Sequence, residues 1–189
     1  VFYNCPLDSV YIGREHSYSG TYSPFYGNSS LRAVTMGEHV TKIGEREFYG
    51  CKNLSSVTIS ESVDSIGTSA FYNCDSLKSI TIPDGVTYIG NSAFYDCSGL
   101  ASVDFGSNVS SIGESAFMGC SSLKSVEIPG KVTSIDKYTF QNCSALESVS
   151  IPGSVTKIHT YAFINCSGLK YVTIEDGSES LYMVANGSN

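Results

Sequence analysis

The sequence predicts a mostly β solenoid whose turns are each 23 residues long. Self-similarity at one fixed period indicates structural units that stack only on their neighbours. Inside each unit, apolar and polar residues alternate over a short stretch, which is typical of a strand with one buried face. Proline or glycine follows this stretch at the same offset in most units and stops the strand there. The register is defined by a recurring leucine, found at Leu31, Leu54, Leu77, Leu100, Leu123, Leu146 and Leu169.

The unit that begins at Leu77 shows the elements in order. In LKSITIP, Ile80 and Ile82 face one way while the residues between them face the other, which predicts a strand that stops at Pro83. A second extended stretch, VTYI over residues 86–89, is closed by a glycine. The AF segment that follows is too short for more than one tight helical turn, so we expect short turns or 3-10 segments there. Stacking of the first strands, about 4.8 Å apart, predicts a parallel sheet along one side.

The residue before the cysteine position of each unit is asparagine, aspartate or glycine. These residue types tolerate a left-handed backbone better than others do. We therefore expect a turn with positive φ at the same place in every unit. The residues concerned are Asn4, Gly50, Asn73, Asp96, Gly119, Asn142 and Asn165.

A cysteine occupies one position of six successive units, and Cys5 lies two periods before the first of them with Asn28 in the position between. Equal phase places each thiol at the same interior location, so the favoured interpretation is a structural ladder of buried, reduced cysteines. Disulfides between turns are an alternative, although they need converging side chains and in-register side chains point the same way. A metal centre is a third interpretation, but no CxxC-type cluster with His or acidic partners occurs, and we expect no cofactor. The ladder consists of Cys51, Cys74, Cys97, Cys120, Cys143 and Cys166.

The repeat also predicts the domain organisation, which is a single solenoid over residues 1–189. An irregular unit covers 8–30, six regular units cover 31–168, and a partial, atypical unit covers 169–189. The opening residues VFYNC match AFYNC at positions 70–74, so the chain enters in the middle of a repeat. We therefore expect it to be part of a longer protein.

Composition and motif content exclude several classes of function. The formal net charge of -7 argues against nucleic acid, because binding to phosphate backbones needs a stripe of Lys and Arg. No run of about 18 apolar residues occurs, so we expect no membrane insertion of this chain. His16, His39 and His159 occupy unrelated positions of the repeat, and no catalytic motif stands in its required context. We expect the protein not to be an enzyme.

The pattern LxxVxIPxxVxxIGxxAFxxCxxL at a period of 23 resembles the BspA-like, treponemal-type leucine-rich repeat family. The resemblance covers about residues 8 to 175. It implies a right-handed, curved leucine-rich repeat solenoid with the LxxVxI strands on the concave face. It also implies a bacterial cell-surface or secreted protein, since many family members are of that kind and some bind host extracellular-matrix proteins or other cells.

Three surfaces are candidates for binding. The first is the strand face, formed by the outward residues of the LxxVxI strands, which are small, polar and slightly acidic. The second is the tyrosine stripe, which occupies the position after the recurring Phe in the N-terminal half. The third is the loop over residues 13–23, with Tyr18 and Tyr22. The strand face includes Thr35, Thr58, Thr81, Asp104, Glu127, Ser150, Thr173 and Tyr171, and the tyrosine stripe consists of Tyr26, Tyr49, Tyr72 and Tyr95.

These observations favour a non-enzymatic adhesion or protein-interaction module that contacts host extracellular or neighbouring-cell proteins, with glycans as a second class of partner. A structural spacer without a ligand of its own is the alternative. A flat face that binds ice or a polymer is a third candidate, disfavoured because acids interrupt the Ser/Thr columns and the sheet should curve. The residues predict no oligomeric state.

Overall fold

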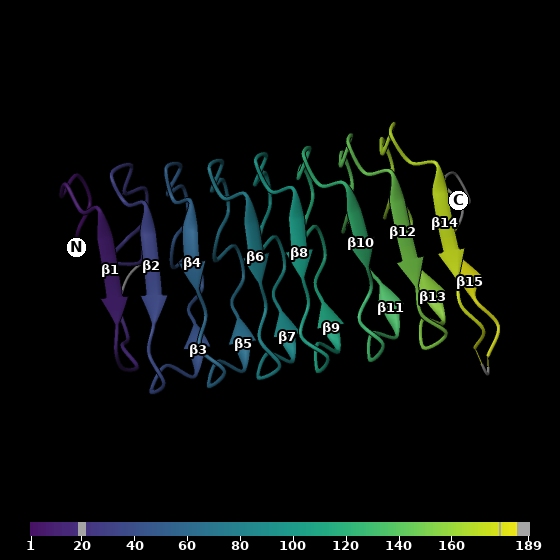
Figure 1. Ribbon diagram of the computed structural model, residues 1–189, viewed down its shortest axis with the longest axis horizontal. Coiled ribbons are helices and arrows are strands. Elements are labelled where there is room, and N and C mark those ends of the chain that lie inside the picture. Colours follow the sequence, from purple (N-terminus) through teal and green to yellow (C-terminus); the bar gives the residue numbers. More distant parts are fainter. Residues whose placement is uncertain (19–21, 178, 185–189) are drawn as a thin grey trace.

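The computed structural model describes residues 1–18, 22–177 and 179–184, which form one parallel β solenoid (Figure 1). Each turn contributes a strand to a first column, as the LxxVxI pattern predicts. The predicted mostly β solenoid with a parallel sheet along one side is therefore confirmed. The first column consists of β1 (Ser9–Ile12), β2 (Ala33–Met36), β4 (Ser56–Thr58), β6 (Ser79–Thr81), β8 (Ser102–Asp104), β10 (Ser125–Glu127), β12 (Ser148–Ile151) and β14 (Tyr171–Ile174).

The second extended stretch of each unit forms a second column of shorter strands, which Figure 1 shows beside the first. Every strand pair in both columns is parallel, because each turn brings the chain back in the same direction. The second column consists of β3 (Lys42–Ile43), β5 (Ser65–Ile66), β7 (Tyr88–Ile89), β9 (Ser111–Ile112), β11 (Ser134–Ile135), β13 (Lys157–Ile158) and β15 (Tyr182–Met183).

The strand register follows the repeat period and departs from it only at the two ends. In the regular units the paired residues are 23 apart, as with Ser79 and Ser102. Ser9 pairs with Ala33, an offset of 24, because the irregular unit places its leucine one position early. Lys157 pairs with Tyr182, an offset of 25 at the atypical last unit. The deviations thus fall in the units whose sequences are irregular.

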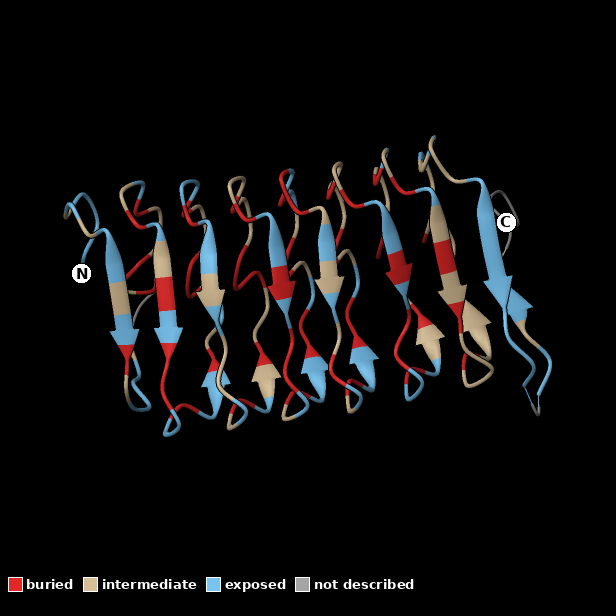
Figure 2. Cartoon of the chain, viewed as in Figure 1, coloured by how far each residue is buried: buried red, intermediate tan, exposed pale blue. Residues whose placement is uncertain are grey.

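The core is one continuous stack of equivalent side chains. Figure 2 marks buried residues in red, and they recur in successive turns. The recurring phenylalanines lie ring on ring, with centroids 5.1 to 5.6 Å apart and planes within 18° of parallel. The recurring leucines from Leu31 to Leu146 are fully buried beside them. Each ring therefore packs on the turn before and the turn after it. The stacked rings are Phe25, Phe48, Phe71, Phe94, Phe117, Phe140 and Phe163.

The predicted positive-φ turn before the cysteine position is confirmed in every unit. φ lies between 51° and 76° at the seven predicted residues, and at Gly27 it is 65°. A second series with positive φ was not predicted, because its residue types carry no left-handed preference. It comprises Arg46, Ser69, Ser92, Ser115, Tyr138 and Tyr161.

The two positive-φ positions bracket the AF segment and turn its backbone toward the neighbouring unit. The amides of Ser69, Phe71 and Asn73 donate to the carbonyls of Asn91, Ala93 and Tyr95 in the next turn, at 2.8 to 2.9 Å. This third ladder is formed by turns, and the residues that the structure describes contain neither an α-helix nor a 3-10 helix. Hydrogen bonds between successive solenoid units thus hold the third side. Of the two alternatives that the sequence allowed there, short turns and 3-10 segments, the structure has the short turns.

Removal of one stacked ring tests how the core is held. We expect Phe94→Ala to lower the free energy of unfolding by about 3 to 5 kcal/mol, because the cavity is enclosed by neighbouring turns that cannot close in on it. Urea denaturation followed by circular dichroism gives the value. Ser102→Ala, an exposed change one unit away, is the control and should shift the unfolding free energy by less than about 0.5 kcal/mol. Similar small shifts for both variants would contradict the stacked core.

Candidate interaction surfaces

The strand face places seven of the eight predicted residues in one row across neighbouring turns, and Tyr171 lies in the parallel row that contains Ser148. Strand pairing places Thr58 beside Thr35, and Asp104 beside Thr81. Nearly all of the predicted positions are exposed. The exception is the half-buried Ser150, whose hydroxyl donates to Glu175 Oε1 at 3.2 Å. Tyr171 on the last strand is 66% exposed. The face is therefore a polar surface. Among the described residues, the hydrogen bond from Ser150 to Glu175 is the one side-chain contact that covers part of it.

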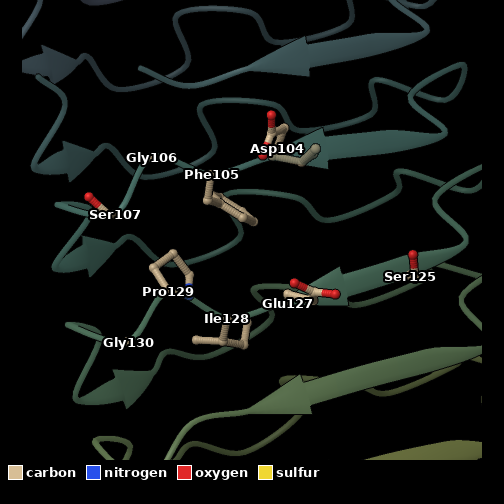
Figure 3. Close-up of a pocket in the computed structure, with 10 residues that line it drawn as sticks. Asp104, Phe105, Gly106, Ser107, Ser125, Glu127, Ile128, Pro129 and Gly130 are labelled. Atoms are coloured by element: carbon tan, nitrogen blue, oxygen red, sulfur yellow. The ribbon is translucent and has the colours of Figure 1, made fainter. Parts of the chain in front are cut away.

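A groove of about 470 Å³ opens on this face between β8 and β10. Figure 3 shows its lining, with Asp104 and Phe105 contributed by one turn and Glu127, Ile128 and Pro129 by the next. No backbone ladder joins β8 to β10, and none joins β4 to β6, although all four strands lie wholly within the described range 22–177. The sequence singled out the two carboxylates but not the groove.

The tyrosine stripe forms a second, separate surface. Tyr26, Tyr49, Tyr72 and Tyr95 stack face to face, with centroids 4.5 to 4.8 Å apart and planes within 7° of parallel. Burial of the hydroxyl, together with the neighbouring tyrosines, raises the pKa of Tyr72 to about 12. Because ring faces cover one another, the stripe offers ring edges and hydroxyls to a partner. A sugar that needs an open ring face finds little to stack on inside the stripe.

The irregular loop does not bring its two tyrosines into one site. Tyr22 is 61% exposed, and its ring centroid lies 4.4 Å from that of Tyr26. Tyr22 therefore extends the tyrosine stripe. Tyr18 turns toward the next unit, where its hydroxyl donates to the Glu45 carbonyl, and burial raises its pKa to about 12. Residues 19–21 of the predicted 13–23 loop lie outside the described residues.

A hydrogen bond between the exposed His16 and the buried Glu47 anchors this loop, and the sequence analysis missed the pair. Glu47 stands where most units have alanine, and only 3% of its side chain is exposed. Burial raises the Glu47 pKa, while the hydrogen bond from His16 Nε2 to its Oε1, 2.9 Å long, opposes that shift. A carboxylate in an alanine position of a core is the signal that could have located the pair.

A second anchor of the loop is the Glu15 carboxylate. It accepts hydrogen bonds from the backbone amide and hydroxyl of Thr41 and from the Lys42 amide. Burial alone would raise the Glu15 pKa, but these hydrogen bonds lower it below the ordinary value for glutamate. The irregular unit is therefore tied firmly to the first regular one.

The six cysteines from Cys51 to Cys166 form an interior ladder of hydrogen-bonded thiols. In each of these six the Sγ donates to a phenylalanine carbonyl 26 residues earlier, at 3.0 to 3.3 Å, as Cys97 does to Phe71. All seven cysteines are free thiols. Asn28 fills the same position in the irregular unit, where its amide donates to the Phe2 and Cys5 carbonyls. Among residues 1–18, 22–177 and 179–184, no group of three His, Cys, Asp or Glu side chains could hold a metal ion.

Comparison with known proteins identifies what this solenoid is similar to. A family profile described as BspA type Leucine rich repeat region matches residues 1–76 and 64–186, with six copies. A search of curated proteins finds no match.

Solved structures of bacterial proteins are similar as well. The T. pallidum leucine-rich repeat protein has 27% sequence identity and a TM-score of 0.77, and the match covers 87% of this chain and 79% of that one. A leucine-rich cell surface protein from Faecalibacterium prausnitzii has 26% identity and a TM-score of 0.52, over 79% of this chain and 61% of that one. A leucine-rich repeat protein from Eubacterium ventriosum has 21% identity and a TM-score of 0.67, over 96% of this chain and 61% of that one. This likeness supports the fold.

The environment of the thiols predicts their reactivity. Burial raises the pKa of Cys97 to about 12, so at pH 8 only about one molecule in ten thousand carries that thiolate. We expect Cys51, Cys74, Cys97 and Cys120 to resist iodoacetamide in the folded protein and to react on denaturation, as read by mass spectrometry of peptides. Cys5 and Cys166 are half-buried and serve as the internal reference for partial access. Rapid labelling of Cys97 at pH 8, or disulfide-linked peptides, would contradict the ladder.

Proposed function

This chain belongs to the BspA type leucine-rich repeat family, and on that premise we propose that it is a non-enzymatic module that binds other proteins. Leucine-rich repeat domains typically mediate protein interactions or serve as repeat scaffolds. The proposed partners are host extracellular proteins or proteins of neighbouring cells. The observation that carries the proposal is the strand face, on which adjacent turns present exposed polar side chains such as Thr58, Thr81 and Asp104.

The proposed location is the bacterial cell surface or the exterior. The F. prausnitzii structure, which belongs to a cell surface protein, supports this assignment. That protein and the E. ventriosum protein are longer than this chain, which spans 61% of each. Within the described residues, no helix has the length and apolar character needed to cross a membrane.

The physical basis of binding would be many shallow contacts on a rigid surface. Interfaces with few aromatic or arginine anchors gain little per contact, and the strand face is built mainly from Ser and Thr. A rigid scaffold offsets this weakness, because little conformational entropy is lost when the partner binds. Affinity should therefore depend on several turns together.

A structural spacer is the second candidate, and the unbroken phenylalanine stack favours it. The rings from Phe25 to Phe163 pack without interruption, which makes a stiff rod suited to hold another domain at a distance. A spacer needs no partner at its strand face. The two candidates therefore differ in whether any protein binds there.

The double variant Thr58→Arg plus Thr81→Arg tests the proposal. Both residues are exposed on adjacent strands, so two bulky cations should block the strand face without disturbing the core. We expect saturable binding of the wild-type chain to at least one protein on an array of extracellular-matrix proteins and glycans, and a loss of about tenfold or more in affinity for the variant.

A matched control keeps the change in net charge and moves it to the second column. Ser111→Arg in β9 plus Thr133→Arg, at the residue before β11, places two arginines at exposed positions in or beside that column, and binding should be retained. Circular dichroism must show the same fold for both variants. Binding that persists in the strand-face variant would move the site to the tyrosine stripe or the irregular loop, and absence of any binding partner would favour the spacer.

A further inference from the structure

The groove between β8 and β10 arises from a corner that leans toward one neighbour. A Cβ on Gly106 would lie 2.4 Å from the Pro83 carbonyl oxygen, so only glycine allows this approach. The next turn has Gly130 at this corner, one residue later than the position equivalent to Gly106. A Cβ added to Gly130 would have no atom within 4 Å. Ser107 adds hydrogen bonds from its amide and hydroxyl to Asp84 Oδ1, at 2.6 and 2.9 Å. The corner is thereby held against the preceding turn and leaves a groove before the following one, which reaches the corner through Lys131 Nζ, 2.6 Å from Asn108 Oδ1.

The walls of the groove combine apolar and acidic groups. Phe105 takes a position that is isoleucine in neighbouring turns, and its half-buried ring lies edge-on to Phe117, with centroids 5.6 Å apart and planes at 84°. Ile128 and Pro129 line the facing side, as Figure 3 shows. Asp104 stands at the mouth of the same groove. The exposed lining of the groove is therefore mainly polar, with Phe105, Ile128 and Pro129 as its apolar part, and a carboxylate stands where each of the two strands ends.

The two carboxylates have no cationic partner of their own. Among the described residues, the side chains of Asp104 and Glu127 form neither an ion pair nor a hydrogen bond, although both are exposed. On the adjacent turn, by contrast, Glu147 already pairs with Lys170 at 3.9 Å. The chain as a whole carries a net charge of -7, so the field at the groove attracts cations.

We propose that this groove binds an arginine side chain presented by an extended segment of the partner protein, an inference that rests on the proposed function. The guanidinium has five N–H donors for the two carboxylates, and its methylene stem can lie along Phe105 and Pro129, the apolar part of the lining. Arginine is favoured over lysine, because the guanidinium also stacks against an aromatic ring, which Phe105 supplies. The groove volume of about 470 Å³ accommodates such a side chain with water to spare.

Blocked tripeptides of sequence Gly-Arg-Gly, Gly-Lys-Gly and Gly-citrulline-Gly are the probes, measured by NMR chemical-shift titration of the full chain. Citrulline keeps the shape of arginine and removes its charge. We expect saturable binding of the arginine peptide with the largest shifts at Phe105, weaker binding of the lysine peptide, and none of the citrulline peptide. Equal binding of arginine and citrulline would overturn the proposal.

Three variants make the test specific. Asp104→Asn plus Glu127→Gln should weaken arginine binding about tenfold or more. Glu61→Gln plus Glu114→Gln removes the same charge at exposed positions away from the groove and should leave binding unchanged. Phe105→Ile installs the residue of the neighbouring turns and should reduce the preference for arginine over lysine.

The outcomes separate this proposal from the proposed function. An equal effect of the two charge variants would mean attraction by net charge alone, and absence of arginine binding would overturn the groove assignment outright. If the same preparation still binds an array protein through its strand face, only the groove assignment fails. If the peptide binds the groove and no array protein binds, the arginine site stands and the adhesive function fails.

Discussion

Every part of this structure depends on the contact between one turn and the next. A 23-residue unit offers about eight apolar side chains, each worth roughly 1.5 to 3 kcal/mol when fully buried, which does not offset the entropy of ordering the unit. Stacking changes this balance, because the ring of Phe94 packs between the rings of Phe71 and Phe117. The backbone amides of these three residues also donate hydrogen bonds to carbonyls of the next turn. The unit that folds is therefore the stack, and an identical interior shape in every turn is the condition for it.

That condition explains which features can vary. Interior positions are fixed by the stack, so the cysteine ladder recurs because a small thiol that donates to the Phe carbonyl fits every turn alike. Departures from the repeat are then informative. Glu47 in an alanine position accompanies the anchored irregular loop, and Phe105 with Gly106 accompanies the groove between β8 and β10. The groove and the anchored loop thus lie where the sequence leaves its own pattern, whereas the strand face and the tyrosine stripe follow it, and one rigid scaffold holds all four.

The sequence predicted the two strands, the corners and the interior positions, because each depends on residue types at a fixed period. It also predicted the left-handed turn at residues such as Asn73, because asparagine and glycine adopt that conformation more readily than other residues. The second left-handed series was missed because Tyr138 and Ser92 carry no such preference, and neighbouring turns impose it. The His16–Glu47 pair and the groove were missed because each joins residues of different turns through a local departure from the repeat.

Amide hydrogen exchange at single-residue resolution tests most directly whether turns are stable only through their neighbours. Leu100→Ala would create a cavity in the unit over residues 100–122, while the flanking units keep their own sequences. The amides of Phe94 and Phe140 lie in those flanking units and donate across turn boundaries. Coupled stacking predicts faster exchange at both amides as well as within 100–122. Faster exchange confined to residues 100–122, with Phe94 and Phe140 unchanged, would contradict the account.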